Sequence, residues 1–112
     1  MITKNDLQNY LTTGATLNKN GEAVTLAGYQ VSFFDGPAVD PSNVEKVLEV
    51  VNEFLRACPA GAFVGLWLNA SGLVCVDYSE NVAKLSEAMK KGIERKQDAI
   101  FDWVLSRCIS TK

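Results

Sequence analysis

The sequence predicts an α+β fold in which helices cover one face of an antiparallel sheet. Residues 62–78 contain two apolar runs joined by the sequence NASG, a pattern typical of a β-hairpin with a glycine in its turn. Residues 44–56 place apolar side chains three and four positions apart, as one face of a helix does. A strand and a helix are expected both before and after this hairpin.

The chain has 112 residues, which is long enough for one domain with its own hydrophobic core. We therefore treat residues 1–112 as a single domain. Its 11 basic and 13 acidic side chains nearly balance, which argues against a strongly basic nucleic-acid binder and against an acidic mimic of DNA. No apolar stretch suits a signal peptide or a membrane span, so we expect a cytoplasmic protein with no membrane partner.

The N-terminal part begins with a helix and continues in extended structure. Thr3 and Asp6 have the spacing of a capping box, and Gly14 ends the helix that they open. An Asn-Gly pair then marks a tight turn within a short extended segment. Alternating side chains over residues 29–34 predict the first main strand.

Two further helices are predicted, one on each side of the hairpin. Ser42 and Glu45 form the S-x-x-E pattern of a capping box at the start of residues 44–56. After the hairpin, Ser79 or Asn81 can cap a third helix. The apolar stripe of this third helix consists of Val82, Leu85, Met89 and Ile93.

Residues 97–109 fit either a helix or a strand. Their apolar side chains can line one helical face, but the run is short and rich in strand-forming residues, so we favour a strand over 99–103. The order is then strand, helix, strand, strand, helix, strand. This order predicts a ferredoxin-like split βαβ (βαββαβ) antiparallel sheet with two helices on one face, plus the N-terminal helix and the short extended segment.

The hairpin also predicts which side chains share a face of the sheet. If its link has an odd number of residues, with Gly72 in a left-handed conformation, one face is wholly apolar and packs against the helices. That face consists of Val64, Leu66, Leu68, Val74, Val76 and Tyr78. The opposite face is the candidate interaction face, and it includes Phe34, Phe63, Trp67 and Asp77. We expect the N-terminal segment, a second copy or a protein partner to cover these aromatic side chains.

The residue types present exclude most forms of side-chain catalysis. The sequence contains no histidine, which removes the Ser-His-Asp and Cys-His arrangements and histidine-ligated zinc. Its three cysteines are widely spaced, and its glycines do not form a phosphate-binding loop. We therefore expect no enzyme, no catalytic residue, no cofactor and no metal. A carboxylate enzyme built on Asp35 or Asp77 is a third hypothesis, after the two binding functions described below.

Basic side chains crowd the last turns of the third predicted helix, namely Lys90, Lys91, Arg95 and Lys96. Cations at a helix C-terminus are favoured by the helix dipole and by solvent. A basic cluster near an aromatic sheet face also suits phosphate binding. The alternative function is therefore a binding module for nucleic acid or a small ligand.

Three short stretches carry a resemblance to a known group of proteins. They read GATL at residues 14–17, GYQVS at 28–32 and AIFDW at 99–103. With these stretches the chain resembles small uncharacterised proteins encoded by bacteriophages and related mobile elements of bacteria. The resemblance implies a mobile-element origin and names no catalytic residue. We therefore expect a binding protein that acts through a protein–protein surface, alone or as a homodimer, as an accessory factor or an inhibitor of a host system.

Overall fold

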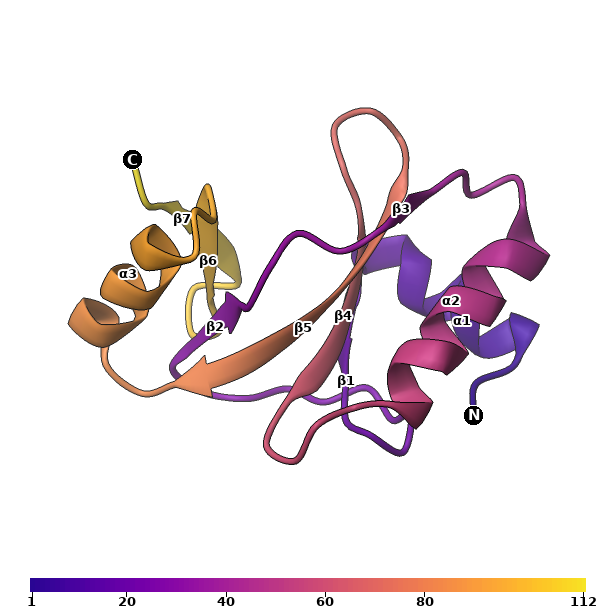
Figure 1. The fold of residues 1–112 in the computed structure, drawn as a ribbon, viewed down its shortest axis with the longest axis horizontal. Helices are drawn as coiled ribbons and strands as arrows, with labels where there is room; N and C mark the ends of the chain where they lie inside the picture. The colour runs from indigo at the N-terminus through magenta and orange to yellow at the C-terminus, as the bar shows by residue number, and fades with distance from the viewer.

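The computed structural model describes residues 1–112 and contains three helices and seven strands (Figure 1). The α+β class is therefore confirmed. In chain order the elements are α1 (Lys4–Thr13), β1 (Ala15–Leu17), β2 (Tyr29–Ser32), β3 (Ala38–Val39), α2 (Val44–Arg56), β4 (Phe63–Leu68), β5 (Val74–Val82), α3 (Leu85–Glu94), β6 (Ala99–Asp102) and β7 (Arg107–Ser110). None of the helices combines the length and the apolar character that crossing a membrane requires.

All seven strands belong to one antiparallel sheet with the order β1-β4-β5-β2-β6-β7, and the short β3 also pairs with β5. The connection through α2 leads from the β2 and β3 region to β4, with β5 between β2 and β4. The connection through α3 leads from β5 to β6, with β2 between them. Each helical connection therefore passes over one intervening strand.

All three helices pack on the same face of the sheet. Leu7 of α1 and Val51 of α2 belong to one buried cluster that includes Val76 of β5. Ala88 of α3 belongs to a second cluster with Val82, which lies on the same face of β5 as Val76 because side chains alternate along a strand. Figure 1 shows α1 and α2 at one end of the sheet and α3 at the other. The opposite face of the sheet has no helix over it.

The link of the hairpin is odd-numbered, so the shared face follows the prediction except at Leu68, which is 47% exposed. Leu66 pairs with Val76 and Val64 pairs with Tyr78, so the apolar side chains of both strands lie on the helix-covered face. Residues 69–73 form the link, and Gly72 has a φ of 79°. An odd-numbered link with a left-handed glycine therefore sets which face is buried, as the sequence predicts.

The predicted cap of α1 is confirmed, and the predicted cap of α2 is wrong. Thr3 and Asp6 form a reciprocal capping box at the start of α1. At α2 the N-cap is Asn43, whose side-chain oxygen accepts a hydrogen bond from the amide of Lys46 at 3.2 Å. Ser42 lies one residue too early, and its amide donates to Asp40 instead.

The predicted start of the third helix is also wrong. β5 continues through Val82, so Ser79 and Asn81 lie in the strand and not at a helix cap. The helix begins at Leu85, and its N-cap residue, Lys84, makes no side-chain cap hydrogen bond. The ladder with β2 extends β5 because Tyr29 pairs with Val82.

The buried stripe of α3 differs from the predicted one. Leu85 and Ile93 are exposed, and the buried residues of the helix are Ala88 and Gly92. A Cβ atom at Gly92 would lie 3.0 Å from side-chain carbons of Ile100 and Thr111. Small residues therefore let α3 pack closely on the sheet; Met89 packs against the same cluster, whereas Leu85 and Ile93 turn outward.

The first main strand is shorter than predicted because the chain bulges after it. The ladder with β5 continues to Phe33, whose amide donates to Tyr78 at 3.0 Å, and resumes at Pro37, whose carbonyl accepts from Val76 at 3.1 Å. The residues between these two points, up to Gly36, form the bulge. A Cβ atom at Gly36 would lie 1.7 Å from the Val76 carbonyl oxygen, so only glycine fits.

The C-terminal segment forms two strands. β6 covers most of the range 99–103 that was predicted to be a strand, and helix is excluded there. Asp102 then accepts hydrogen bonds from the amides of Val104 and Leu105 in a turn. Ser106 has a φ of 51°, and β7 follows it as a strand that the sequence did not predict.

Candidate functional site

The face of the sheet away from the helices carries a group of aromatic and polar side chains. Residues paired across antiparallel strands point to the same face, and the observed pairs place these side chains together. We call this group the open sheet face. It consists of Phe63, Gly65 and Trp67 of β4, Cys75, Asp77 and Ser79 of β5, Gln30 and Ser32 of β2, and Phe101 of β6.

Three of the four predicted residues of the interaction face lie on the open sheet face, and Phe34 does not. Its ring meets the ring of Tyr78 edge to face, with centroids 6.2 Å apart. Tyr78 in turn packs against Phe54 of α2, on the helix-covered side. The bulge after β2 changes the alternation of side chains, so Phe34 is separated from Trp67 and Asp77.

Asp77 is a buried carboxyl group at the centre of the open sheet face, with 9% of the residue exposed. It lies over Gly65, where a Cβ atom would be 2.7 Å from the Asp77 Oδ1 atom. The Ser32 hydroxyl donates a hydrogen bond to Asp77 Oδ2 at 2.9 Å. Burial raises the pKa of Asp77 to about 6, and hydrogen bonds from Ser32 and Trp67 oppose this increase. The carboxyl group therefore titrates at about pH 6.

A second set of polar side chains lies along β2 and is fully hydrogen-bonded. The Gln30 amide nitrogen donates to the Ser79 hydroxyl at 2.9 Å. The Gln30 side-chain oxygen accepts from the Trp103 indole at 3.0 Å and from Asn81 at 3.2 Å. Phe101 packs edge to face against Trp103 with centroids 5.0 Å apart. Buried polar groups that are satisfied in this way fix the positions of the aromatic rings around them.

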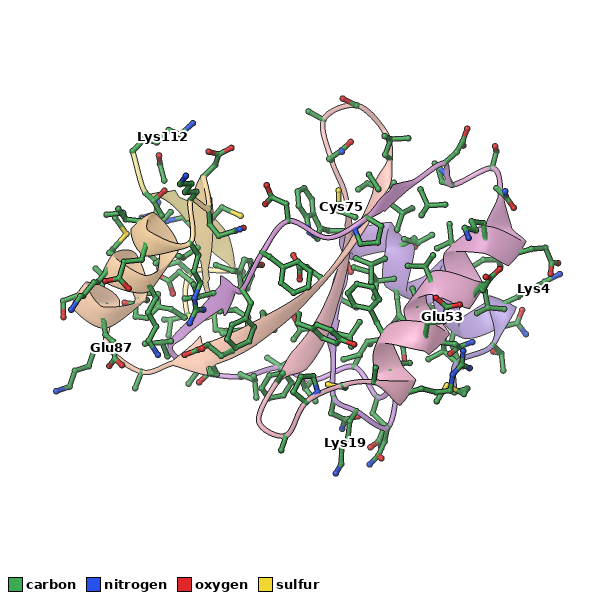
Figure 2. All side chains as sticks on the ribbon, viewed as in Figure 1. Lys4, Lys19, Glu53, Cys75, Glu87 and Lys112 are labelled. Carbon is green, nitrogen blue, oxygen red and sulfur yellow. The ribbon has the colours of Figure 1, made fainter.

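Trp67 is the large side chain that the open sheet face presents to solvent, with 47% of its surface exposed. Phe63 on the same strand is only partly exposed. The backbone at Trp67 is held by its pairing with Cys75, and the Asn69 side chain donates to the Cys75 sulfur at 3.4 Å. Figure 2 shows Cys75 near the base of the hairpin loop. Because α1 packs on the other face, the N-terminal helix does not cover this region.

The basic cluster is divided between partly buried ion pairs and exposed charges. Lys91 and Arg95 both bond to Glu80 of β5. Burial alone would raise the pKa of Glu80, but hydrogen bonds from these two cations hold it below the ordinary value. The guanidinium carbon of Arg95 also lies 4.4 Å from the centroid of the Phe33 ring. Lys90 and Lys96 are exposed and form no ion pair.

A shallow groove of about 510 Å³ opens on the helix-covered side. Its most exposed aromatic side chains are Phe33 and Phe34, at 37% and 46%. The groove is lined by these two residues and by Pro59, Ala60, Gly61, Ala62, Tyr78, Glu80 and Asn81. Sequence reasoning missed it because the bulge that presents both phenylalanines depends on pairing with β5. Gly36, in the sequence Asp35-Gly36-Pro37, was the residue from which the bulge could have been predicted.

The open sheet face holds one carboxyl group of shifted pKa, that of Asp77. Ser32 is the only hydroxyl bonded to Asp77 in the structure, and no group of three or more Cys, Asp or Glu side chains is placed to hold a metal ion. Burial raises the pKa of the thiols of Cys58 and Cys75, which makes them poorer nucleophiles at neutral pH. Asp35 is exposed and accepts a hydrogen bond from Gln97.

The chain was compared with protein-family models, with curated proteins and with solved structures, and none of them matches it. The functional assignment therefore depends on the three surfaces described above. Among them, the open sheet face has the most complete internal support, because its polar side chains are bonded to one another and its rings are fixed by packing.

Proposed function

We propose that this chain is a small non-enzymatic binding protein that acts in the cytoplasm through the open sheet face. The observation that carries the proposal is the exposure of Trp67 on a sheet face that no helix covers. Tryptophan is enriched among the residues that dominate protein–protein binding energies. A half-exposed tryptophan at the edge of a rigid polar network is well suited to such a role.

The rigidity of the face supports the same function. The network of Gln30, Ser79 and Trp103 is already formed in the free chain. Ser32 likewise bonds to Asp77 before any partner arrives. A surface that is ordered in advance loses little conformational entropy on binding, so more of the contact energy contributes to affinity.

We further infer that the segment from β2 to β6 is a ferredoxin-like split βαβ unit, to which β1 and β7 are added at the edges. The central strand order β4-β5-β2-β6 and the position of a helix after β2 and after β5 support this assignment. Together with the resemblance to bacteriophage and mobile-element proteins, this suggests an accessory factor or an inhibitor of a bacterial host system.

Affinity capture from bacterial lysate tests the proposal. The tagged chain, Trp67→Ala and Phe34→Ala are compared, because both residues are aromatic and about half exposed but lie on opposite faces. We expect a protein that is retained by the wild type and by Phe34→Ala and is lost with Trp67→Ala. Retention that is equal for all three chains, or no retained protein at all, contradicts the proposal.

A binding module for nucleic acid or a small ligand is the second candidate. Lys90 and Lys96 favour it because their charges are exposed and form no ion pair. A phosphate-dependent complex with single-stranded RNA or DNA would weaken steeply as salt increases. Lack of any mobility shift at low salt would remove this candidate.

A further inference from the structure

The outer edge of β7 has free backbone hydrogen-bonding groups. The amide of Thr111 donates to the carbonyl of Asp98 at 3.0 Å, so this pair is hydrogen-bonded. Hydrogen-bonded pairs alternate along an antiparallel ladder, and the pairing of Ile100 with Ile109 is therefore the next one. The amides and carbonyls of Cys108 and Ser110 consequently point away from β6, to the outside of the sheet.

The other end of the sheet is protected, in contrast to β7. There the carbonyl of Thr16 in β1 accepts a hydrogen bond from Val24 at 2.9 Å, and Leu17 forms a bridge with Ala23. β7 has no such cover, contains no proline and carries one charged residue, Arg107. Natural edge strands usually carry a cover, a proline or charged side chains as protection against pairing with another chain, and in β7 the single charge of Arg107 lies at the end of the strand.

We propose that a second copy of this chain pairs with β7 antiparallel, edge to edge, so that the two sheets become continuous. The outward groups at Cys108 and Ser110 select the register. Cys108 of one copy then lies opposite Ser110 of the other, and the two-fold axis passes between the two Ile109 residues. This register forms about four main-chain hydrogen bonds, and every outward group of both residues is used.

The charges at the ends of β7 match this two-fold arrangement. In the proposed register Arg107 lies opposite Thr111 of the second copy, whose own neighbour across the β6–β7 ladder is Asp98. Asp98 is exposed and bonds to Lys112 at 2.9 Å; Figure 2 shows Lys112 at the free end of the chain beyond β7. An arginine from one copy therefore approaches an exposed carboxylate of the other, twice in each dimer.

An exposed apolar turn precedes β7. Val104 and Leu105 are 79% and 56% exposed, which makes Val104 the most exposed large apolar side chain of the protein. Ser106, with its positive φ, ends the strand on that side and limits the pairing to a short segment. Because the interface is small, the dimer is expected to dissociate on dilution.

Amide hydrogen exchange of the wild type at low and high protein concentration tests the pairing directly, with reductant present because Cys108 is exposed. The exchange rates of the Cys108 and Ser110 amides should fall at least about tenfold at high concentration, because hydrogen-bonded amides exchange slowly. The exchange rates of the Arg107 and Ile109 amides, which already bond to β6, should not depend on protein concentration. Equal exchange of Cys108 and Ser110 at both concentrations overturns the proposal.

Sedimentation of two variants at one position provides the second test. Ser110→Pro removes an outward amide without removing a bond to β6, and Ser110→Ala keeps that amide. We expect Ser110→Pro to raise the dimer dissociation constant at least about tenfold, and Ser110→Ala to behave as the wild type. Circular dichroism confirms that both variants are folded. A wild type that stays monomeric up to about 1 mM, or a folded Ser110→Pro chain that dimerises normally, refutes the edge pairing.

This inference is independent of the proposed function because it uses another surface. Trp67→Ala should dimerise as the wild type does, and Ser110→Pro should still capture the partner of the open sheet face. Failure of one pair of experiments therefore leaves the other unaffected.

Discussion

The free energy of unfolding should decrease as pH rises through the range in which Asp77 ionises. Burial raises the pKa of this carboxyl group from 3.8 to about 6 in the folded protein. Between these two values the folded chain keeps a proton that the unfolded chain has released. The contribution to stability is therefore fully present below pH 3.8 and is lost as pH rises through about 6.

The expected magnitude follows from the two pKa values. A change from 3.8 to about 6 corresponds to about 3 kcal/mol in total, and about 2 kcal/mol of this lies between pH 4.5 and 7. Urea unfolding followed by tryptophan fluorescence gives the free energy of unfolding across this range. Asp77→Asn cannot ionise, so the wild type minus this variant isolates the contribution of the carboxyl group. Glu94→Gln, at an exposed position of α3 that forms no ion pair, is the matched control, because the negative charge of Asp35 itself helps to raise the pKa of Asp77.

Other carboxyl groups act in the opposite direction and cancel in the difference. Hydrogen bonds hold the pKa values of Asp6 and Asp40 below their ordinary values, so their contributions are lost as pH falls. The ion pairs of Glu80 have the same sign. A wild-type minus Asp77→Asn difference that is flat between pH 4.5 and 7, or that increases with pH, would refute the description of Asp77 as a buried and poorly solvated group.

Three substitutions test the local structure, each by its free energy of unfolding in urea. Gly36→Ala should cost about 2–3 kcal/mol because a Cβ atom would overlap a carbonyl oxygen of β5; an unchanged stability would mean that the bulge is absent. Asn43→Ala should lower the free energy of unfolding by about 1 kcal/mol because a helix cap is lost, whereas Ser42→Ala should change it little. The reverse ranking would show that Ser42 is the cap, as the sequence predicts. Tyr78→Phe should cost about 1 kcal/mol because the hydroxyl donates to the Phe54 carbonyl at 2.7 Å, and a neutral result would place that hydroxyl in solvent.

The parts of the fold that could be predicted from sequence are those set by local pattern. Alternation on both sides of an odd link placed Leu66 and Val76 on the same face, and the residue spacing at Thr3 and Asp6 was sufficient to define a cap. Both features depend on residues close together in the chain. They form in the structure as the sequence predicts.

The features that were missed depend on contacts between distant residues. Phe34 leaves the predicted face because a bulge held by β5 changes its direction. Glycine ordinarily lowers the stability of a helix, yet Gly92 is the position at which α3 packs closely against Ile100. β7 is short and follows a turn at Ser106, so no alternation long enough to recognise remained. Nor does periodicity show on which face of a sheet α1 will pack.

The affinity of the captured partner for two variants is the most direct test of the central claim, that binding occurs on the open sheet face. Calorimetry with the purified partner compares Trp67→Ala with Phe34→Ala. The account predicts that Trp67→Ala weakens binding by about 2 kcal/mol or more, as the loss of a tryptophan that dominates an interface does, and that Phe34→Ala leaves the affinity unchanged. A loss of affinity with Phe34→Ala, together with unchanged binding by Trp67→Ala, would contradict the account and place the binding site in the groove.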